Sequence, residues 1–331
     1  MKKIDDGPHV FVVGSARSGT SLCSTFIKSS PDCVSYHAES KLLKDCIFKY
    51  GPLTDEGARA RFYADWLESR QYRRSGLDRE QADALFDGCQ DYYCFLNAVM
   101  MAMATQQGAH YWLDGTPDNM YVVDEIVEAF PNARIIHMIR DGRAVATSLA
   151  RLGWSGVPTS NFDDALDYAA IKWEMQVRRL RDFSKRITDR YLEVRYEDLV
   201  TDPECISQTI CDFLGISLIE VDSVVEDSDN NPMSTLNKPN SPFGDMGEGI
   251  SSVAVDRWRK LLEPAQQQRL DALLGETLDE LGYERYSEAT ATASLRLRKG
   301  MRMARMELRR MLKEHTPLGK YSTSPLEIGK D

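Results

Sequence analysis

The sequence has 331 residues, of which 42% are hydrophobic and 28% are charged. These proportions are ordinary for a globular protein and exclude a chain that is disordered throughout, and the length suffices for a large domain with a sizeable core. The formal net charge of −10 argues against a general nucleic-acid-binding protein, which would carry a basic surface.

Seven cysteines are spread along the chain without a C-x-x-C pair. A chain of this size does not need disulfides to stabilise its core, and an odd number leaves at least one thiol unpaired. We therefore expect reduced thiols, no zinc site and a cytoplasmic location. The first residues show no signal-peptide pattern and no apolar run reaches membrane-spanning length, in line with that expectation.

Residues 9–13 (HVFVV) form an apolar, β-branched run that ends at Gly14, and this pattern predicts a buried parallel strand. The residues that follow open a predicted helix, where backbone N–H groups and the helix N-terminus favour an anion. A P-loop NTPase has Lys where this chain has Thr20, and that Lys reaches the outer phosphates of a triphosphate. Here Arg17 supplies the cation, which suits a single 5′-phosphate better. The predicted phosphate contacts are Arg17, Ser18, Gly19, Thr20 and Ser21.

Residues 54–107 show no strand pattern and indicate a helical insertion, which we expect to cap the site. Three further apolar runs, residues 111–113, 134–139 and 191–196, alternate with helical stretches, of which residues 162–185 form the longest. Alternation of strands and helices predicts a parallel sheet with helices on both faces.

Arg140 directly follows the run at 134–139, and Ser148 lies one to two turns into the next predicted helix. Ligands of open α/β sheets bind beyond the carboxyl ends of the strands, where a guanidinium and a hydroxyl can share a second phosphate. Taken alone, Arg140 is equally well explained as a surface residue paired with Asp141. Together with the first loop, Arg140 and Ser148 indicate a nucleotide that carries both 5′- and 3′-phosphates.

These motifs resemble those of the sulfotransferases that use PAPS (3′-phosphoadenosine 5′-phosphosulfate), especially the branch with tyrosylprotein sulfotransferases and bacterial relatives. Residues 14–22 resemble the family's 5′-phosphosulfate loop. Residues 136–148 resemble its 3′-phosphate motif, which implies 3′-phosphate contacts for Arg140 and Ser148.

Two weaker motifs follow in the same order. Residues 194–199 (VRYEDL) resemble the family's strand end, which places a tyrosine, here Tyr196, near the nucleotide. Residues 256–258 (DRW) resemble a segment that closes over the donor, which implies a phosphate contact for Arg257.

The resemblance also identifies a candidate general base. Residues 31–41 resemble the segment in which the family places a catalytic glutamate, which maps that role to Glu39. His37 competes, since other branches use histidine, and Glu39 is alternatively a capping or salt-bridging residue. A base here would take the proton from the acceptor hydroxyl as it attacks sulfur. The candidate catalytic residues are Glu39, His37 and Arg17.

The sequence departs from the family at one position. The family often has a Lys just before Thr-Pro that stabilises the leaving group, and this chain has Gly115 there. Either Arg17 or Arg257 replaces that cation, or the chain is a slow or altered enzyme.

Near the C-terminus, residues 293–313 contain eight Lys or Arg and one Glu. Leu297, Met301, Ala304, Leu308 and Met311 recur at spacings of four and three, which predicts a basic amphipathic helix. We expect it to pack on the domain or on a second copy in a homodimer; the alternative is binding to an anionic membrane surface or an acidic partner.

The resemblance implies an α/β, three-layer, P-loop-like fold with a central parallel sheet, spanning residues 1–286, followed by the basic helix and tail at 287–331. It implies sulfonate transfer from PAPS to a hydroxyl acceptor with release of PAP and no required metal. The acceptor stays open among carbohydrates, small alcohols or phenols, lipid headgroups and peptides. The alternatives are a catalytically weakened nucleotide- or glycan-binding homologue and a divergent P-loop kinase.

Overall fold

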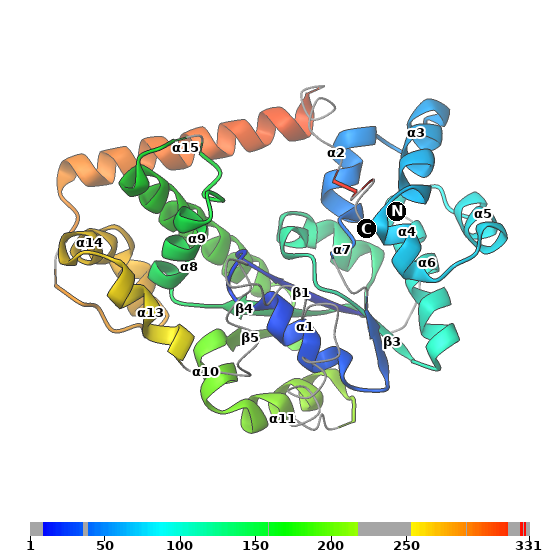
Figure 1. The fold of residues 1–331 in the computed structure, drawn as a ribbon, viewed down its shortest axis with the longest axis horizontal. Helices are drawn as coiled ribbons and strands as arrows, with labels where there is room; N and C mark the ends of the chain where they lie inside the picture. Colours follow the sequence, from blue (N-terminus) through cyan, green and yellow to red (C-terminus); the bar gives the residue numbers. More distant parts are fainter. Residues whose placement is uncertain are drawn as a thin grey trace.

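Five parallel strands form one sheet at the centre of the computed structural model, in the order β2-β3-β1-β4-β5 (Figure 1). The strands are β1 (Val10–Gly14), β2 (Cys33–Ser35), β3 (Tyr111–Asp114), β4 (Arg134–Ile139) and β5 (Tyr191–Arg195). The structure describes residues 9–35, 39–157, 159–217, 253–288, 290–316, 325, 326 and 328. The predicted α/β class and four predicted strands are confirmed. The sequence does not predict β2, because three residues are too few to show a periodic pattern.

Successive side chains along a strand point to opposite faces of the sheet, so each face packs against its own set of helices. Val10 and Val12 of β1 pack on one face, and Phe11 and Val13 pack on the other. The first face is covered by α1 (Thr20–Lys28), α10 (Tyr196–Thr201) and α11 (Pro203–Leu214), and the second by α6 (Tyr92–Gln107), α7 (Val123–Ala129) and the C-terminal half of α9 (Phe162–Ser184). All five residues of β1 are therefore buried, as expected of a central parallel strand.

The predicted helical insertion is present beside the β2–β3 end of the sheet (Figure 1). It comprises α3 (Glu56–Leu67), α4 (Arg70–Ser75), α5 (Arg79–Asp87) and α6. Each helix starts at a residue whose side chain accepts a backbone N–H bond, which is the preferred N-cap chemistry; these residues are Asp55, Ser69, Asp78 and Asp91. Aromatic rings of Phe62, Trp66 and Phe95 contact one another in its interior, so most of its aromatic residues build a core rather than line a pocket.

Short turns of helix connect the strands to the rest of the domain. Between β2 and α3 lie the π-helix η1 (Leu42–Cys46) and α2 (Ile47–Tyr50), and the 3₁₀-helices η2 (Pro117–Val122) and η3 (Thr188–Arg190) follow β3 and precede β5. Because η1 and η2 leave the carboxyl ends of β2 and β3, they lie at the edge of the sheet where ligands of this fold class bind.

A second helical layer extends beyond β4 (Figure 1). It contains α8 (Gly142–Arg151), the N-terminal half of α9, α13 (Val253–Leu261) and α14 (Pro264–Glu280). Arg143 of α8 is buried and forms 2.7 Å ion pairs with Asp141 and Asp271, and its guanidinium lies 4.6 Å from the ring of Trp258. This charged centre joins α8 to α13 and α14.

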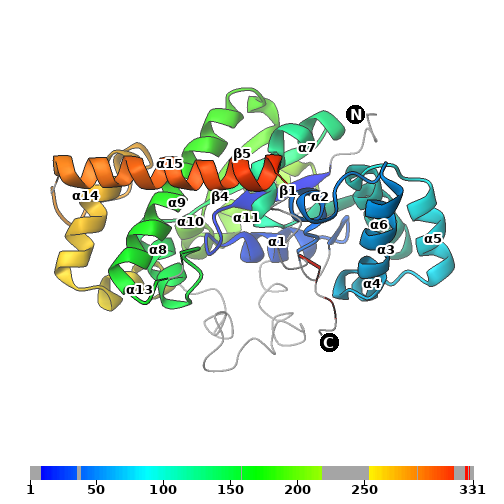
Figure 2. The same ribbon diagram turned by 90° about the horizontal axis from the view of Figure 1, so that it is seen from above.

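The predicted basic helix is α15 (Ala293–His315), which lies across α9 (Figure 2). Arg302 forms a 2.7 Å ion pair with Asp164, and Lys299 a 2.5 Å ion pair with Glu174. The helix packs on the domain, as expected, but not through the predicted apolar residues: Leu297 and Met301, with Leu308 and Met311, stay exposed. A different face of the helix, not singled out by the sequence pattern, is the one that packs. Within the described residues, no helix has an apolar stretch long enough to cross a bilayer.

Gly142→Ala tests the packing of α8 on α9. A Cβ at Gly142 would lie 2.4 Å from Cε3 of Trp173, so we expect a loss of about 1–3 kcal/mol in the free energy of unfolding, measured by urea denaturation. The control is Gly300→Ala in α15, where a Cβ would have no neighbour within 4 Å and where Ala should stabilise the helix by up to about 1 kcal/mol. A gain in stability at Gly142 would contradict this packing.

Candidate functional site

The loop between β1 and α1 has the backbone of an anion site. Its Gly19 has a φ of 93°, and a Cβ there would lie 2.6 Å from Cδ2 of Tyr196, so only glycine fits. Arg17 has a φ of 73°, a left-handed conformation that costs a residue with a side chain about 1–2 kcal/mol. Such strain persists where the surrounding structure imposes it, and it is most common at ligand sites.

The N-terminus of α1 is open to an anion. Gly19 provides no capping side chain and the first turn has no acidic residue, so its backbone N–H groups lack the usual side-chain partner. Ser18 is fully buried, and its Oγ has no hydrogen-bond partner among the residues that the structure describes. Phosphate or sulfate oxygens would satisfy these donors. Thr20 is buried and Ser21 is exposed in the same turn.

The structure brings the two predicted phosphate motifs together. Arg17 donates from Nε to Ser148 Oγ at 3.1 Å, and Arg140 donates from Nη1 to the carbonyl oxygen of Arg17 at 3.3 Å. The guanidinium of Arg140 lies 4.0 Å from the ring centre of Tyr196, within cation–π range. Four predicted site residues from three separate motifs thus form one cluster at the carboxyl ends of β1, β4 and β5.

A buried network that the sequence motifs do not reveal holds this cluster. The backbone N–H of Asp141 donates to Glu197 Oε1 at 2.9 Å, and Tyr283 donates to Glu197 Oε2 at 2.9 Å. Burial raises the pKa of Glu197, and its hydrogen bonds oppose that rise. Asp141, the residue after Arg140, also pairs with Arg143, which in turn pairs with Asp271 of α14. The turn that carries Arg140 is therefore anchored to other elements. Arg143 is therefore a structural residue rather than a phosphate contact.

The roles of two further predicted residues stay predictions. His37 lies outside the described residues. Arg257 is exposed on α13, next to the buried Trp258. Its predicted role at the donor stays a prediction.

Glu39 follows β2 and is held against the end of β3. Its neighbour Ser40 donates from Oγ to Asp114 Oδ2 at 2.5 Å, and the Ser40 backbone N–H donates to Thr116 Oγ1 at 3.0 Å. Asp114 also accepts bonds from the Thr116 N–H (3.0 Å), Thr116 Oγ1 (2.6 Å) and Asn119 Nδ2 (2.9 Å). All four side chains of this hub are buried. The sequence run that builds this hub is Asp114-Gly-Thr-Pro-Asp-Asn119. From the sequence we interpreted only Gly115 of that run.

The Glu39 side chain is 45% exposed, and its carboxylate lies 3.7 Å from the Lys41 ammonium. Partial burial raises the pKa of Glu39; Lys41 opposes the rise, and Asp118, Asp114 and Asp45 add to it. A carboxylate with a raised pKa and an exposed face is chemically suited to accept a proton.

Gly115 lies directly against α1. A Cβ at this position would be 2.4 Å from Ser24 Oγ, so the Lys of the family pattern does not fit here without a shift of Ser24. Nearby, Lys44 pairs with Asp118 at 3.2 Å and lies 4.4 Å from the ring centre of Tyr121. Lys41 thus lies beside Glu39 and Lys44 beside Asp118, although no cation occupies position 115.

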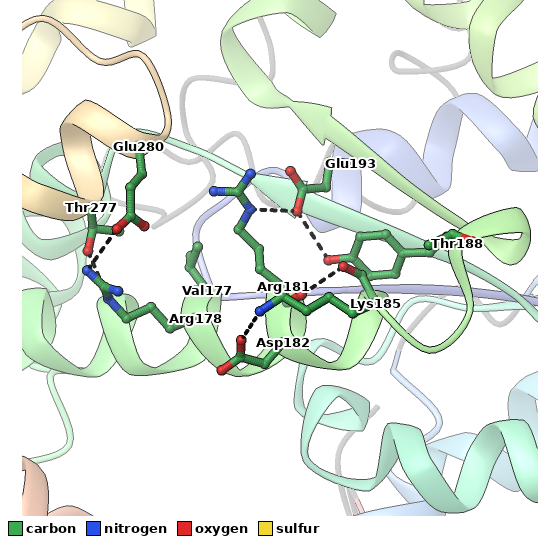
Figure 3. Close-up of a pocket in the computed structure, with 11 residues that line it drawn as sticks. Val177, Arg178, Arg181, Asp182, Lys185, Thr188, Glu193, Thr277 and Glu280 are labelled. Atoms are coloured by element: carbon green, nitrogen blue, oxygen red, sulfur yellow. Dashed lines mark hydrogen bonds and ion pairs between the residues drawn. The ribbon is translucent and has the colours of Figure 1, made fainter.

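A hollow of about 630 Å³ opens elsewhere, between α9, β5 and α14 (Figure 3). Its charged groups are paired: Arg181 donates to Glu193 at 3.1 Å, and Lys185 pairs with Asp182 at 2.7 Å. None of the predicted site residues lines it. The hollow is thus separate from the cluster around Arg17.

Comparison with known proteins decides the family. Residues 8–220 match the family model described as "Sulfotransferase family". The chain belongs to the sulfotransferase family. This confirms the resemblance drawn from the sequence motifs, and the matched range contains every predicted site residue except Arg257.

Relatives of this sulfotransferase are distant in sequence. Protein-tyrosine sulfotransferase 1 of Danio rerio is 22% identical over 287 residues, which cover 84% of this chain and 73% of that protein. Protein-tyrosine sulfotransferase of Drosophila melanogaster is 24% identical over 283 residues, covering 85% of this chain and 52% of that protein. The sulfotransferase domain of the Synechococcus PCC 7002 olefin synthase has the same fold, with a TM-score of 0.60 at 21% identity, over 86% of this chain and 98% of that one.

The hub beneath Glu39 predicts a large and local stability effect. Asp114→Ala would leave four buried hydrogen-bond donors without an acceptor, so we expect a loss on the order of 3 kcal/mol or more in the free energy of unfolding, measured by urea denaturation. The matched control is Asp118→Ala in the same turn, a carboxylate that is 45% exposed and paired with Lys44. It should cost about 1 kcal/mol or less. Equal losses in the two variants would refute the hub.

Proposed function

We propose that this sulfotransferase transfers a sulfonate group from PAPS to a hydroxyl acceptor and releases PAP. The observation that carries the proposal is the contact cluster of Arg17, Arg140, Ser148 and Tyr196 beside the open N-terminus of α1. Two guanidinium groups, a hydroxyl and a helix N-terminus together suit a ligand with two separate phosphate groups.

Each residue of the cluster has a proposed contact with one end of this donor. The N–H groups of residues 17–21, the Arg17 guanidinium and the Ser18 hydroxyl would hold the 5′-phosphosulfate. Arg140 and Ser148 would hold the 3′-phosphate, and the ring of Tyr196 would keep Arg140 in place from one side. The buried, unpartnered Ser18 Oγ supports this assignment, because a ligand oxygen would complete its hydrogen bonding.

The chemistry is an in-line displacement at sulfur, for which the donor supplies an activated sulfonate with PAP as leaving group. The acceptor oxygen forms a bond to sulfur as the bond between sulfur and the bridging oxygen of the 5′-phosphate breaks. Glu39 takes the hydroxyl proton, a step worth on the order of 10²–10⁴-fold in rate. Arg17 and the loop N–H groups face the charge that develops on the leaving phosphate, so they act by electrostatic preorganisation.

Gly115 gives one specific reason to consider a second function. Without the family Lys, the leaving group depends on Arg17, with Arg257 as the other candidate cation. If neither suffices, the chain is a catalytically weakened homologue that binds the nucleotide without turning it over. Formation of a sulfated product separates the two functions. A divergent P-loop kinase is disfavoured because Thr20 replaces its phosphate-binding Lys.

The acceptor is proposed only as a hydroxyl compound. Two relatives are protein-tyrosine sulfotransferases by name, which keeps a phenolic hydroxyl among the candidates. Carbohydrates, small alcohols and lipid headgroups remain the others.

Titration with PAP in the presence of EDTA, measured by calorimetry, tests the donor site. We expect PAP to bind and Arg140→Ala to weaken it by roughly 10–100-fold, since a charge-assisted hydrogen bond is lost. Arg151→Ala, at the exposed last residue of α8, the helix that follows Arg140, is the matched control and should leave PAP affinity unchanged. Tighter binding of ATP with Mg²⁺ than of PAP would overturn the proposal.

The pH dependence of kcat/KM tests Glu39, with radiolabelled PAPS and an acceptor found in a panel of phenols and sugars. The base acts when deprotonated, so activity falls as pH falls through its pKa, which partial burial raises above the ordinary value of about 4.3. Glu39→Gln should remove this acid limb and lower kcat/KM by about 10²–10⁴-fold while PAP affinity is kept.

Lys41→Met is the companion variant. Because the Lys41 charge lowers the pKa of Glu39, its loss should move the acid limb to higher pH. An acid limb that survives Glu39→Gln and disappears in His37→Asn would assign the base to His37 instead.

A further inference from the structure

The C-terminal helix α15 is apolar on two opposite faces. The inner face packs on the domain through Leu295, Met303 and Met306, and is pinned by the ion pairs of Lys299 and Arg302. The helix lies along the upper edge of the molecule in Figure 1, so its other face points away from the domain. The side chains on that outer face are therefore not needed for the packing of the domain.

The outer face carries large apolar side chains. Leu297 is 65% exposed, Met301 56%, Leu308 57%, Met311 47% and Leu312 42%. With Ala304, which is also exposed, these residues recur at spacings of three and four and so form one stripe along the helix. We call this set of six residues the outer stripe.

This exposure is concentrated on one element. In the part of the chain that the structure describes, the other large hydrophobic side chains that are as exposed are Trp154 and Tyr286. Single exposed apolar residues need no explanation, but a continuous stripe of them marks an interaction surface. We therefore expect a binding partner to cover the outer stripe, and we call that partner its occupant.

Charge identifies the occupant. At 100° per residue, Arg298, Arg305 and Arg309 lie together along one border of the outer stripe. All three are exposed, and the structure shows no ion pair between them and other described residues. The whole chain has a net charge of −10, yet residues 293–313 carry eight Lys or Arg and one Glu. The occupant must accept apolar side chains and present negative charge beside them.

A second copy of the chain paired antiparallel fits this poorly. When two identical helices pair antiparallel through the same stripe, the same border of each helix meets, so three arginines would face three arginines. Like charges in that arrangement oppose association. An anionic bilayer surface meets both requirements, since acyl chains accept the apolar residues and phosphate headgroups attract the arginines.

We propose that α15 docks this sulfotransferase onto anionic membrane surfaces, with the outer stripe inserted at the headgroup boundary and Arg298, Arg305 and Arg309 among the lipid phosphates. The inner face would stay packed on α9, so the protein would bind as a peripheral, reversible membrane protein. This role is independent of the donor and acceptor assigned above.

Sedimentation of the full chain with lipid vesicles tests the proposal. We expect binding to vesicles of phosphatidylcholine with phosphatidylserine, little binding to pure phosphatidylcholine, and weaker binding at high salt. Replacing Arg298, Arg305 and Arg309 together with Gln should weaken binding on the order of 100-fold. Leu297→Gln, Met301→Gln and Leu308→Gln together should also abolish stable binding, because the apolar insertion is lost.

The matched control removes three exposed arginines elsewhere: Arg79→Gln, Arg151→Gln and Arg186→Gln. It changes the net charge equally and should leave vesicle binding within about twofold, because none of the three arginines belongs to α15. Thermal melts of all variants establish that each remains folded.

Two results would overturn the proposal. One is a folded, monomeric chain that does not bind anionic vesicles at low salt. The other is a stable dimer in analytical ultracentrifugation that the Leu297, Met301 and Leu308 substitutions dissociate, since that would make a second copy the occupant.

Discussion

The parallel pairing of β1 between β3 and β4 is the constraint on which the candidate site depends. Its register aligns Gly14 with Met138 and Phe11 with Asp114, so the carboxyl ends of the three strands reach one edge of the sheet. A Cβ at Gly14 would lie 2.5 Å from the Met138 carbonyl oxygen, which shows how closely β1 and β4 approach where the loops diverge. From this edge the Arg17 loop, the Arg140 turn and the Asp114 turn all emerge.

Two buried polar networks convert that alignment into fixed side-chain positions. On one side, Glu197 and the Asp141–Arg143–Asp271 chain hold the turn that carries Arg140. On the other side, Asp114 holds the segment that carries Glu39. Buried polar groups of this kind are costly unless every member is bonded, so they specify one arrangement of the loops. The proposed phosphate ligands and the proposed base are thus held by separate networks, and each can be perturbed without the other.

The distribution of charge divides the molecule in a similar way. Most of the chain is acidic, whereas the Arg17–Arg140 cluster and the outer border of α15 are basic. Arg17 and Arg140 are half-buried and in contact with polar or aromatic partners, as expected of residues that receive one specific ligand. Arg298 and its neighbours are exposed on a helix surface, as expected of residues that meet a diffuse anionic surface.

The sequence by itself determined the α/β class, four of five strands and the helical insertion, because these patterns are local signals. From local phosphate motifs it also predicted Arg17, Arg140, Ser148 and Tyr196 as site residues. Only the tertiary structure decided the contacts between residues that lie far apart in the sequence. It brought those four residues into contact, placed Ser24 against Gly115, and built the Asp114 hub from residues 40, 114, 116 and 119. It also decided which face of α15 is buried. The sequence pattern singled out one apolar face of this helix, but the opposite face packs, because Asp164 and Glu174 on α9 pair with Arg302 and Lys299 there.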